Sequence, residues 1–169
     1  LFKEYVEANK ESIQKRVQEE REKMKNRIED YKPKELTINL PTATKENVFY
    51  PLIDYELKDD IKDSYGKVLY KKGFVFNPLH YISLNEKYIF IDYTDKKQRE
   101  WIKKQEINKD ITAKIIITNG RVFDAIKEFE REVFYANDIL IDKFKLEAVP
   151  SIVEQEQDRI KVKQFKLKD

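Results

Sequence analysis

The sequence predicts an α/β fold built around a central mixed β-sheet. Two apolar runs, Tyr88–Asp92 and Lys114–Thr118, are rich in the β-branched and aromatic residues that favour buried strands. The segment from Asp95 to about Gln105 lies between them, and its start is typical of a capped helix. A strand, a helix and a strand in this order form a βαβ unit, whose two strands we expect to be parallel.

Further elements are predicted after this unit. Apolar residues at helical spacing predict a second helix over residues 121–131, followed by a short strand at Val133–Tyr135. A short helical or turn-like segment over 139–144 precedes two more strands, Val149–Val153 and Ile160–Phe165, which form a C-terminal hairpin. The last strand alternates apolar and polar residues, which is typical of an edge strand.

This order, β-α-β-α-short element-β-β, is the order of a thioredoxin-like domain. In that fold a proline enters the penultimate strand, is usually cis and faces the corner between the first strand and the first helix. Pro150 takes this place, so we expect a cis Val149–Pro150 bond. We therefore predict a thioredoxin-like domain over residues 80–169, with a central mixed sheet, a βαβ unit, a proline-started strand and a C-terminal hairpin.

Two segments are predicted at the N-terminal side. Residues 1–32 form an amphipathic helix, because apolar residues recur mostly at spacings of three, four or seven and Pro33 ends the run. This helix either lies solvated on the body of the protein or docks on a partner as in a coiled coil, and disorder in solution is a third reading. Residues 33–51 form a largely extended linker with prolines at 33, 41 and 51. The candidate partner contacts on the helix are Val6, Ile13, Val17, Met24 and Ile28.

Residues 52–79 are predicted to form a β-hairpin subdomain. Strands at Tyr55–Lys58 and Lys67–Tyr70 flank a turn that contains Gly66, and Gly73 lies in a second turn before a short strand.

The segment Asn77-Pro78-Leu79 ends the last strand of this subdomain, because Pro78 cannot donate a ladder hydrogen bond. Its alternative role is to brace the hairpin against the following domain or a partner.

Composition excludes several classes of function. The net charge is only +2, with 34 basic and 32 acidic residues interspersed, so the chain lacks the electrostatic footprint of a nucleic-acid-binding protein. It has no cysteine, which excludes thiol catalysis, disulfide bonds and Cys-based zinc sites. No run approaches the roughly 18 apolar residues that span a membrane. Because the sequence starts at Leu1, we expect it to begin inside a longer precursor from which a signal peptide is removed.

A catalytic group of a thioredoxin-like domain would lie at the corner between the first strand and the first helix. An active thioredoxin-like oxidoreductase needs a thiolate at this helix N-terminus, where the dipole lowers the pKa of the thiol. Here Asp95 and Gln98 occupy the corner instead. A carboxylate can cap the helix but cannot exchange disulfides, so we interpret Asp95 as an N-cap, with a contact to a partner as the alternative.

Other candidate groups are isolated. His80 is the single histidine, and no second His or Cys can join it around a metal. Asp59, Asp60 and Asp63 lack the glycine and terminal glutamate of a calcium loop, so we interpret them as solvated turn residues. We expect no catalytic residue, metal or cofactor. A thiol-free enzyme would need a deep polar pocket with carboxylates of perturbed pKa.

Three motifs stand in order along the chain: G-x-V at Gly66–Val68, G-x-x-x-N-P-L at Gly73–Leu79, and D-x-x-Q at Asp95–Gln98 after an apolar strand. In these motifs the chain resembles the TraW family of conjugative pilus assembly proteins from F-type type IV secretion systems. The resemblance covers roughly residues 48–165, with further matches at Lys114–Gly120, Val133–Tyr135 and Phe144–Ser151. The family's acidic N-terminal motif is missing, and Tyr135–Asp138 replaces its usual F-D-x-x-G turn.

The resemblance implies an exported periplasmic protein that is needed for pilus assembly and works with TrbC, a related thioredoxin-like partner. It does not imply catalysis. We therefore expect a redox-inactive assembly factor of the mating channel that acts by protein–protein contact. The alternative is a periplasmic chaperone that binds extended peptides in the groove beside Pro150.

Overall fold

The computed structural model describes residues 10–29, 31 and 37–168, so Val6 and its predicted contact lie outside the described residues. The chain divides into two compact units, residues 1–33 and residues 34–169. Each unit is described by itself.

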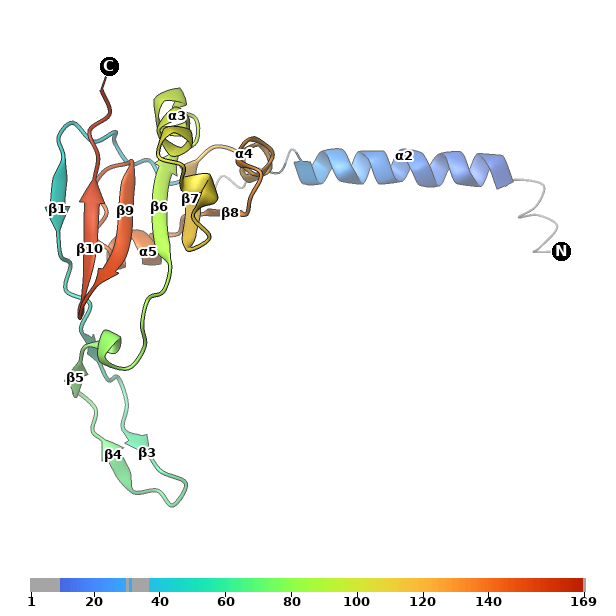
Figure 1. The fold of residues 1–169 in the computed structure, drawn as a ribbon. Coiled ribbons are helices and arrows are strands. Elements are labelled where there is room, and N and C mark those ends of the chain that lie inside the picture. The colour runs from blue at the N-terminus through green and yellow to red at the C-terminus, as the bar shows by residue number, and fades with distance from the viewer. Residues whose placement is uncertain (1–9, 30, 32–36, 169) are drawn as a thin grey trace. The chain divides into compact units, whose positions relative to one another are not determined.

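The larger unit contains a six-stranded mixed sheet in the order β1-β10-β9-β6-β7-β8 (Figure 1). Its members are β1 (Asn47–Phe49), β6 (Lys87–Asp92), β7 (Ala113–Asn119), β8 (Val133–Tyr135), β9 (Ser151–Glu156) and β10 (Arg159–Gln164). Strands β6, β7 and β8 are parallel, whereas β9 pairs antiparallel with both β6 and β10. The predicted parallel βαβ unit and C-terminal hairpin are therefore present.

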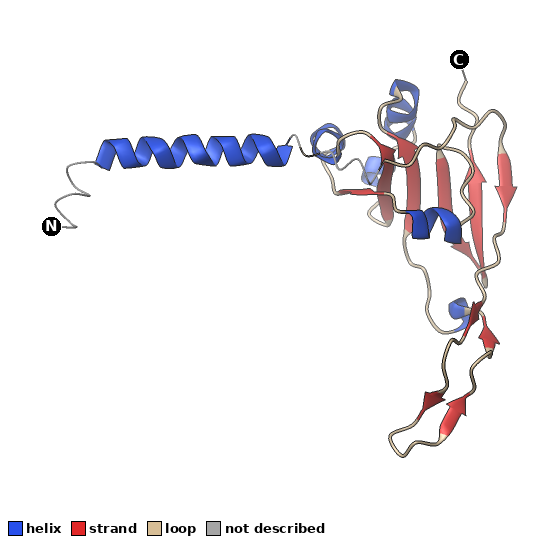
Figure 2. Ribbon diagram, turned by 180° about the vertical axis from the view of Figure 1, so that it is seen from behind, coloured by secondary structure: helices blue, strands red, loops and turns tan. Residues whose placement is uncertain are grey.

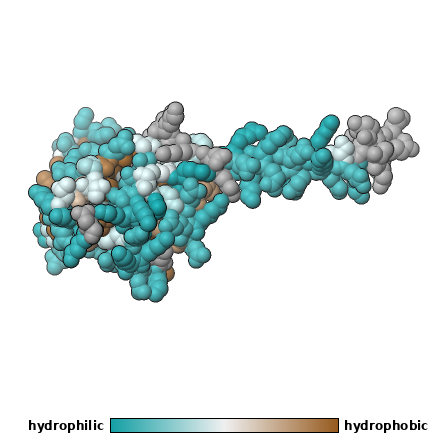
Figure 3. Space-filling view, turned by 90° about the horizontal axis from the view of Figure 1, so that it is seen from above, coloured by the Kyte–Doolittle hydropathy of each residue, from teal (hydrophilic) through white to brown (hydrophobic). Residues whose placement is uncertain are grey.

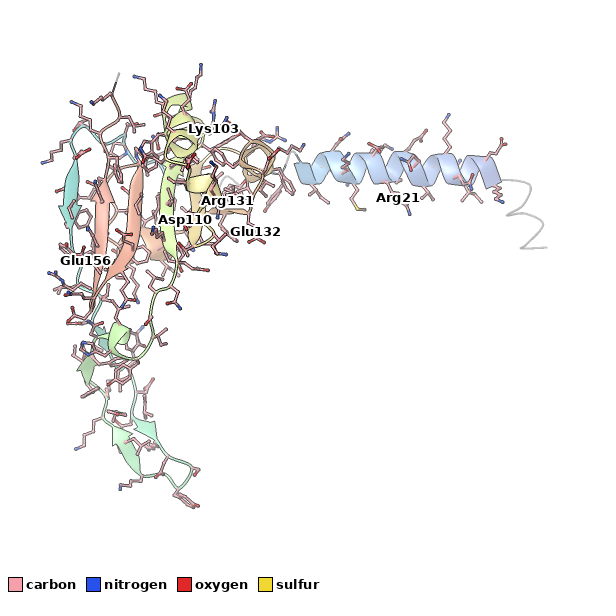
Figure 4. The ribbon with its side chains drawn as sticks, viewed as in Figure 1. Arg21, Lys103, Asp110, Arg131, Glu132 and Glu156 are labelled. Carbon is pink, nitrogen blue, oxygen red and sulfur yellow. The ribbon has the colours of Figure 1, made fainter. Side chains whose placement is uncertain are left out.

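The predicted linker over residues 33–51 is wrong in part, because this stretch contributes a strand. β1 pairs antiparallel with β10, with Val48 opposite Lys163. The last strand is therefore not at the sheet edge, contrary to the expectation from its alternating pattern. Tyr50 secures the end of β1, since its hydroxyl donates a hydrogen bond of 2.6 Å to Glu156 Oε2 (Figure 4). A three-residue strand is too short to give a periodic signal in the sequence.

Helices cover both faces of this sheet. The helices are α3 (Lys96–Lys104), α4 (Val122–Phe129) and α5 (Asp138–Lys143), with 3-10 turns η2 (Pro78–His80) and η3 (Ile107–Lys109). Trp101 and Ile102 of α3 and Phe129 of α4 pack on one face of the sheet. Phe144, just after α5, packs with Phe90 on the other face, where Figure 2 shows α5 lying across the sheet.

The core follows the two-residue period of its strands. Ile89 and Ile91 belong to the cluster beneath α3 and α4, whereas Phe90 between them belongs to the opposite cluster. All three are almost completely buried. Burying each such side chain contributes about 1.5–3 kcal/mol, so β6 is a principal source of stability.

Residues 52–82 form a long two-stranded arm that extends away from the sheet (Figure 1). It comprises β2 (Tyr55–Glu56), β3 (Ile61–Lys62), β4 (Val68–Tyr70) and β5 (Val75–Phe76). The predicted pairing of Tyr55–Lys58 with Lys67–Tyr70 is wrong: β2 pairs with β5, and β3 pairs with β4 closer to the tip. The tip turn closes at Asp63 and Gly66, as predicted, but the strand that enters it is β3, which Leu57–Asp60 separates from β2.

The smaller unit is described over α2 (Lys10–Glu29), a helix of 20 residues with no Gly or Pro. Its apolar residues Ile13, Val17, Met24 and Ile28 are all exposed to solvent. Seen from above, its surface is largely hydrophilic (Figure 3). Within the described residues, no helix combines the length and apolar character needed to cross a membrane.

Candidate functional site

The corner between β6 and α3 is closed by its own hydrogen bonds. Asp95 Oδ1 accepts a bond of 2.9 Å from the backbone N–H of Lys97, which confirms the interpretation of Asp95 as the N-cap of α3. Asp92 Oδ1 accepts bonds from both the backbone N–H and the hydroxyl of Thr94, at 2.8 and 2.6 Å. The carboxylates of the corner thus satisfy backbone donors that a helix start leaves unpaired.

Gln98 completes this network from inside the protein. Its side chain is fully buried. Its Oε1 accepts a hydrogen bond of 2.9 Å from the Asp92 N–H, and its Nε2 donates to Asp95 Oδ2 at 3.1 Å and to Thr42 Oγ1 at 3.5 Å. A buried amide with all these partners fixes the corner, and none of its polar groups is left to act on a substrate.

The groove beside Pro150 is already occupied. The predicted cis Val149–Pro150 bond is present. The N–H of Val149 donates to the carbonyl of Pro41 at 3.0 Å, and its carbonyl accepts from the N–H of Ala43 at 2.8 Å. Thr42, between these two residues, forms a parallel bridge with Val149. The backbone groups that an extended peptide would need are therefore used by residues 41–43 of the same chain.

An ion cluster, which the sequence did not reveal, joins α3 to α4. Glu128 on α4 lies 2.7 Å from Lys103 Nζ and 3.4 Å from Arg99 Nε, and it accepts a bond of 2.8 Å from the Tyr93 hydroxyl (Figure 4). Arg99 also stacks over the Tyr93 ring at 5.2 Å. A Cβ at Gly120 would lie 2.8 Å from that ring, so Gly120 leaves the space in which Tyr93 packs.

The charges of this cluster shift the pKa values of its members. Burial, followed by the hydrogen bond to Glu128, raises the pKa of Tyr93 to about 12. Burial by itself would raise the pKa of Glu128, but the hydrogen bonds from Lys103 and Tyr93 and the nearby positive charges outweigh it, so the pKa is lowered. Glu128 therefore stays ionised and Tyr93 stays protonated near neutral pH, which is the state in which the phenol donates to the carboxylate and the carboxylate pairs with Lys103 and Arg99.

A second clamp holds the loop before β7. Arg131 Nη1 donates to the carbonyls of Ile107 at 2.7 Å and of Asp110 at 3.1 Å, and its Nη2 donates to the carbonyl of Ala113 (Figure 4). Hydrogen bonds from Thr112, with a smaller contribution from Lys87, lower the pKa of Asp110. Carbonyls held in this way are satisfied locally, so this cluster too is structural.

The segment Asn77-Pro78-Leu79 joins the arm to the sheet. Asn77 Oδ1 accepts from the Leu79 N–H at 2.9 Å, and its Nδ2 donates to the carbonyl of Asp158 in the β9–β10 turn at 2.7 Å. Beyond it, the Leu84 N–H donates to Gln155 Oε1 at 2.6 Å. The interpretation of this segment as a brace between the hairpin and the following domain matches these contacts.

The two family-signature glycines shape the arm itself. Gly66 and Gly73 both have a φ of 85°, a conformation that residues with a Cβ rarely adopt. The N–H of Gly66 closes the tip turn on the carbonyl of Asp63, and the N–H of Gly73 donates to the carbonyl of Leu57 in the middle of the arm.

One face of the arm carries an exposed apolar hollow of about 230 Å³, which we call the arm hollow. Aromatic rings contact one another along it, with centroids 5.1 Å apart for Tyr70 and Phe74 and 5.6 Å apart for Phe76 and Tyr81. Tyr70, Phe74 and Tyr81 are each more than one-third exposed. A projecting, exposed apolar surface of this kind is typical of a protein contact site. The hollow is lined by Leu57, Ile61, Tyr70, Phe74, Phe76 and Tyr81.

Metal-ligating side chains do not form a cluster among the described residues. Nowhere in this part of the chain do three or more His, Asp or Glu side chains gather as metal ligands. His80 is exposed at the end of η2.

Comparison with known proteins gives one curated relative. The chain is 32% identical to Protein TraW of Escherichia coli (strain K12) over 98 residues, which is 57% of this chain and 46% of that protein. This similarity supports a TraW-like family. The chain spans about half the length of the TraW protein that it matches. No family model matches the chain, and no solved structure matches it.

Proposed function

We propose that the chain is a periplasmic assembly factor of an F-type type IV secretion system, which takes part in conjugative pilus assembly by protein–protein contact and without catalysis. The similarity to TraW supports the system. The arm hollow carries the proposed mode of action, because it is a solvent-exposed apolar surface on a projecting element.

A thioredoxin-like, redox-inactive domain is part of this proposal. The parallel pair β6–β7, with β9 antiparallel to β6 and β10 beyond it, supports the thioredoxin-like order. The place where a redox-active member of that fold holds its thiolate is occupied by the network of Asp95, Gln98 and Asp92. A corner in which each of these side chains bonds a neighbouring residue supports a role in shape.

The same geometry weighs against the alternative of a peptide chaperone at the groove beside Pro150. Both backbone groups of Val149 are bonded to Pro41 and Ala43. An extended peptide would have to displace this segment of the chain, so no observation favours a peptide-holding function there.

Co-purification with a TrbC-like protein tests the proposal. The full chain carries an affinity tag, and binding is compared between the wild type and a double variant of the arm hollow, Tyr70→Ser with Phe74→Ser. Val48→Ser is the matched control, because Val48 is exposed to a similar extent on β1 of the main sheet.

We expect the arm variant to lose the TrbC-like protein and the control to retain it. If the folded wild-type chain binds neither this partner nor other periplasmic components of the secretion channel, the proposed function is wrong. Cell fractionation of the full-length protein tests the periplasmic location separately.

A further inference from the structure

Helix α2 carries four apolar side chains in one narrow line, which we call the α2 stripe: Ile13, Val17, Met24 and Ile28. At about 100° of rotation per residue, these residues fall within a sector of about 60°. Ile13 and Met24 are eleven residues apart, as are Val17 and Ile28. An eleven-residue repeat stays close to the helical period, so the stripe runs almost parallel to the helix axis.

The charged side chains that border the α2 stripe are basic with one exception, and Gln14 is a neutral residue of the same border. Among the described residues of α2, Glu20 is the single acidic side chain at the border, and Lys23 Nζ lies 3.0 Å from its Oε1. The acidic residues lie mainly on the opposite face of the helix, at positions 11, 19 and 22, together with Lys15. The basic border consists of Arg21 and Lys25 on one side and Arg16, Lys23 and Arg27 on the other.

This arrangement disfavours pairing with a second copy. When two helices pack along apolar stripes, the residues that border the stripes face each other and set partner choice. Two copies of α2 would bring arginine and lysine together on both sides in the parallel and in the antiparallel orientation. Like charges at such positions are destabilising, so the border works against self-association.

We propose that α2 binds a helix of a partner protein whose own apolar stripe is bordered by aspartate and glutamate. The α2 stripe supplies the apolar contact, and the guanidinium groups of Arg16, Arg21 and Arg27 can each hold a carboxylate through paired N–H donors. The partner's apolar residues should recur at alternating spacings of four and seven. This inference rests on the proposed function, since it assumes that the chain acts by binding proteins.

An anionic membrane is the competing occupant of a basic amphipathic helix. Helices that lie in the membrane interface bury a broad apolar face rich in Trp, Phe and Leu. The α2 stripe is one side chain wide and contains none of these residues. The narrow stripe therefore fits a second helix better.

Two synthetic helical peptides test this inference with the full chain. Both have the length of α2 and carry Ile and Leu at spacings of four and seven, but one borders its stripe with glutamate and the other with lysine. Their affinities are measured by fluorescence anisotropy at low and high NaCl. We expect the glutamate-bordered peptide to bind about tenfold more tightly or better, because several ion pairs each add a few tenths of a kcal/mol, and we expect this preference to shrink in high salt.

Variants of α2 make the test specific. The triple variant Arg16→Glu, Arg21→Glu and Arg27→Glu should reverse the preference towards the lysine-bordered peptide. Lys15→Glu is the matched control, because it changes charge on the opposite face of the same helix and should leave the preference unchanged. Val17→Asp should abolish binding of both peptides. Circular dichroism checks that each variant keeps its helix content.

Three results would overturn the inference. The first is equal or no binding of the two peptides by the wild-type chain. The second is a stable dimer of the chain in sedimentation experiments, which would make a second copy the occupant. The third is tighter binding to phosphatidylserine-containing vesicles than to the glutamate-bordered peptide. The peptides contain no secretion component, so this inference can fail while co-purification with a TrbC-like protein succeeds, and the reverse.

Discussion

The corner at the start of α3 and the arm of residues 52–82 differ in the burial and bonding of their side chains. At the corner, polar groups are buried and bonded to one another, as Gln98 is to Asp92, Asp95 and Thr42. On the arm, by contrast, aromatic side chains such as Tyr70, Phe74 and Tyr81 are exposed to solvent. The hydrogen bonds of the corner therefore stabilise the chain itself, whereas the exposed apolar surface of the arm is available to bind another molecule. Substitutions at the corner should act on folding, and those on the arm should act on binding.

The largest effect on folding is expected for Gln98→Ala. The substitution removes the hydrogen-bonding partner of the Asp92 N–H and opens a small buried cavity. Together these changes should lower the free energy of unfolding by about 2–4 kcal/mol, measured by urea denaturation. Gln105→Ala at the exposed end of the same helix is the control and should stay within about 0.5 kcal/mol of the wild type. A Gln98→Ala protein of wild-type stability would show that the corner is not a source of stability.

A smaller effect, and one that depends on pH, is expected for Glu128→Gln. The variant weakens the bonds of residue 128 to Lys103, Arg99 and Tyr93, and should lose about 1–2 kcal/mol at neutral pH. The folded-state pKa of Glu128 lies below its unfolded value. Its contribution is thus complete above the unfolded pKa of about 4.3 and is lost as the pH falls through the lower folded pKa.

The difference in unfolding free energy between the wild type and Glu128→Gln should accordingly narrow in acid. Urea titrations at neutral pH and at successive values below about pH 4 measure it. Glu132→Gln is the control, since this carboxylate is mostly exposed and lies 3.9 Å from Lys114. A difference that persists unchanged in acid would assign the loss to packing and not to charge.

The cap of α3 should have an effect of about 1 kcal/mol. Asp95→Ala removes the acceptor for the Lys97 N–H and should lower the free energy of unfolding by this amount in thermal or urea denaturation. Asp95→Asn keeps a capping oxygen but loses the second acceptor, which bonds Gln98 Nε2, so it should recover only the part of the loss that belongs to the cap. Equal losses in both variants would mean that the charge, and not the cap, is what the corner needs.

The smallest effect on folding is expected on the arm. Phe74→Ser should change the stability of the main unit by less than about 1 kcal/mol, because Phe74 is exposed and its ring packs with those of Tyr70 and Phe76 on the arm. It should nevertheless weaken co-purification of the TrbC-like protein, whereas Val48→Ser should not. A large loss of stability with unchanged binding would reverse the comparison between the corner and the arm.

The sequence predicts the parts of this fold that are encoded locally. The apolar runs of β6 and β7, the helix between them and the proline that enters β9 all lie where expected. The pairing of β1 with β10, and of residues 41–43 with Val149, joins segments more than 100 residues apart in sequence. Such short segments carry no periodic signal, and their partners are chosen by tertiary packing.

The candidate site shows the same division. The capping role of Asp95 depends on its place just before a helix, so it could be predicted. Glu128, Arg99 and Lys103 are ordinary charged residues on helices, and only the packing of α3 beside α4 brings them together. The arm hollow was also missed, because the predicted hairpin paired Tyr55–Lys58 with the wrong strand and so placed its aromatic residues incorrectly.

The strand β1 also shields part of an edge of the main sheet. Its three residues pair with Val162–Gln164 of β10, where the strand would otherwise present a row of unpaired N–H and C=O groups. A fragment that begins at residue 80, where the sequence places the start of the domain, would lose both β1 and the residues 41–43 that pair with Val149. Its bare edge would be a template for other copies of the chain, so a soluble form of this domain must begin before residue 41.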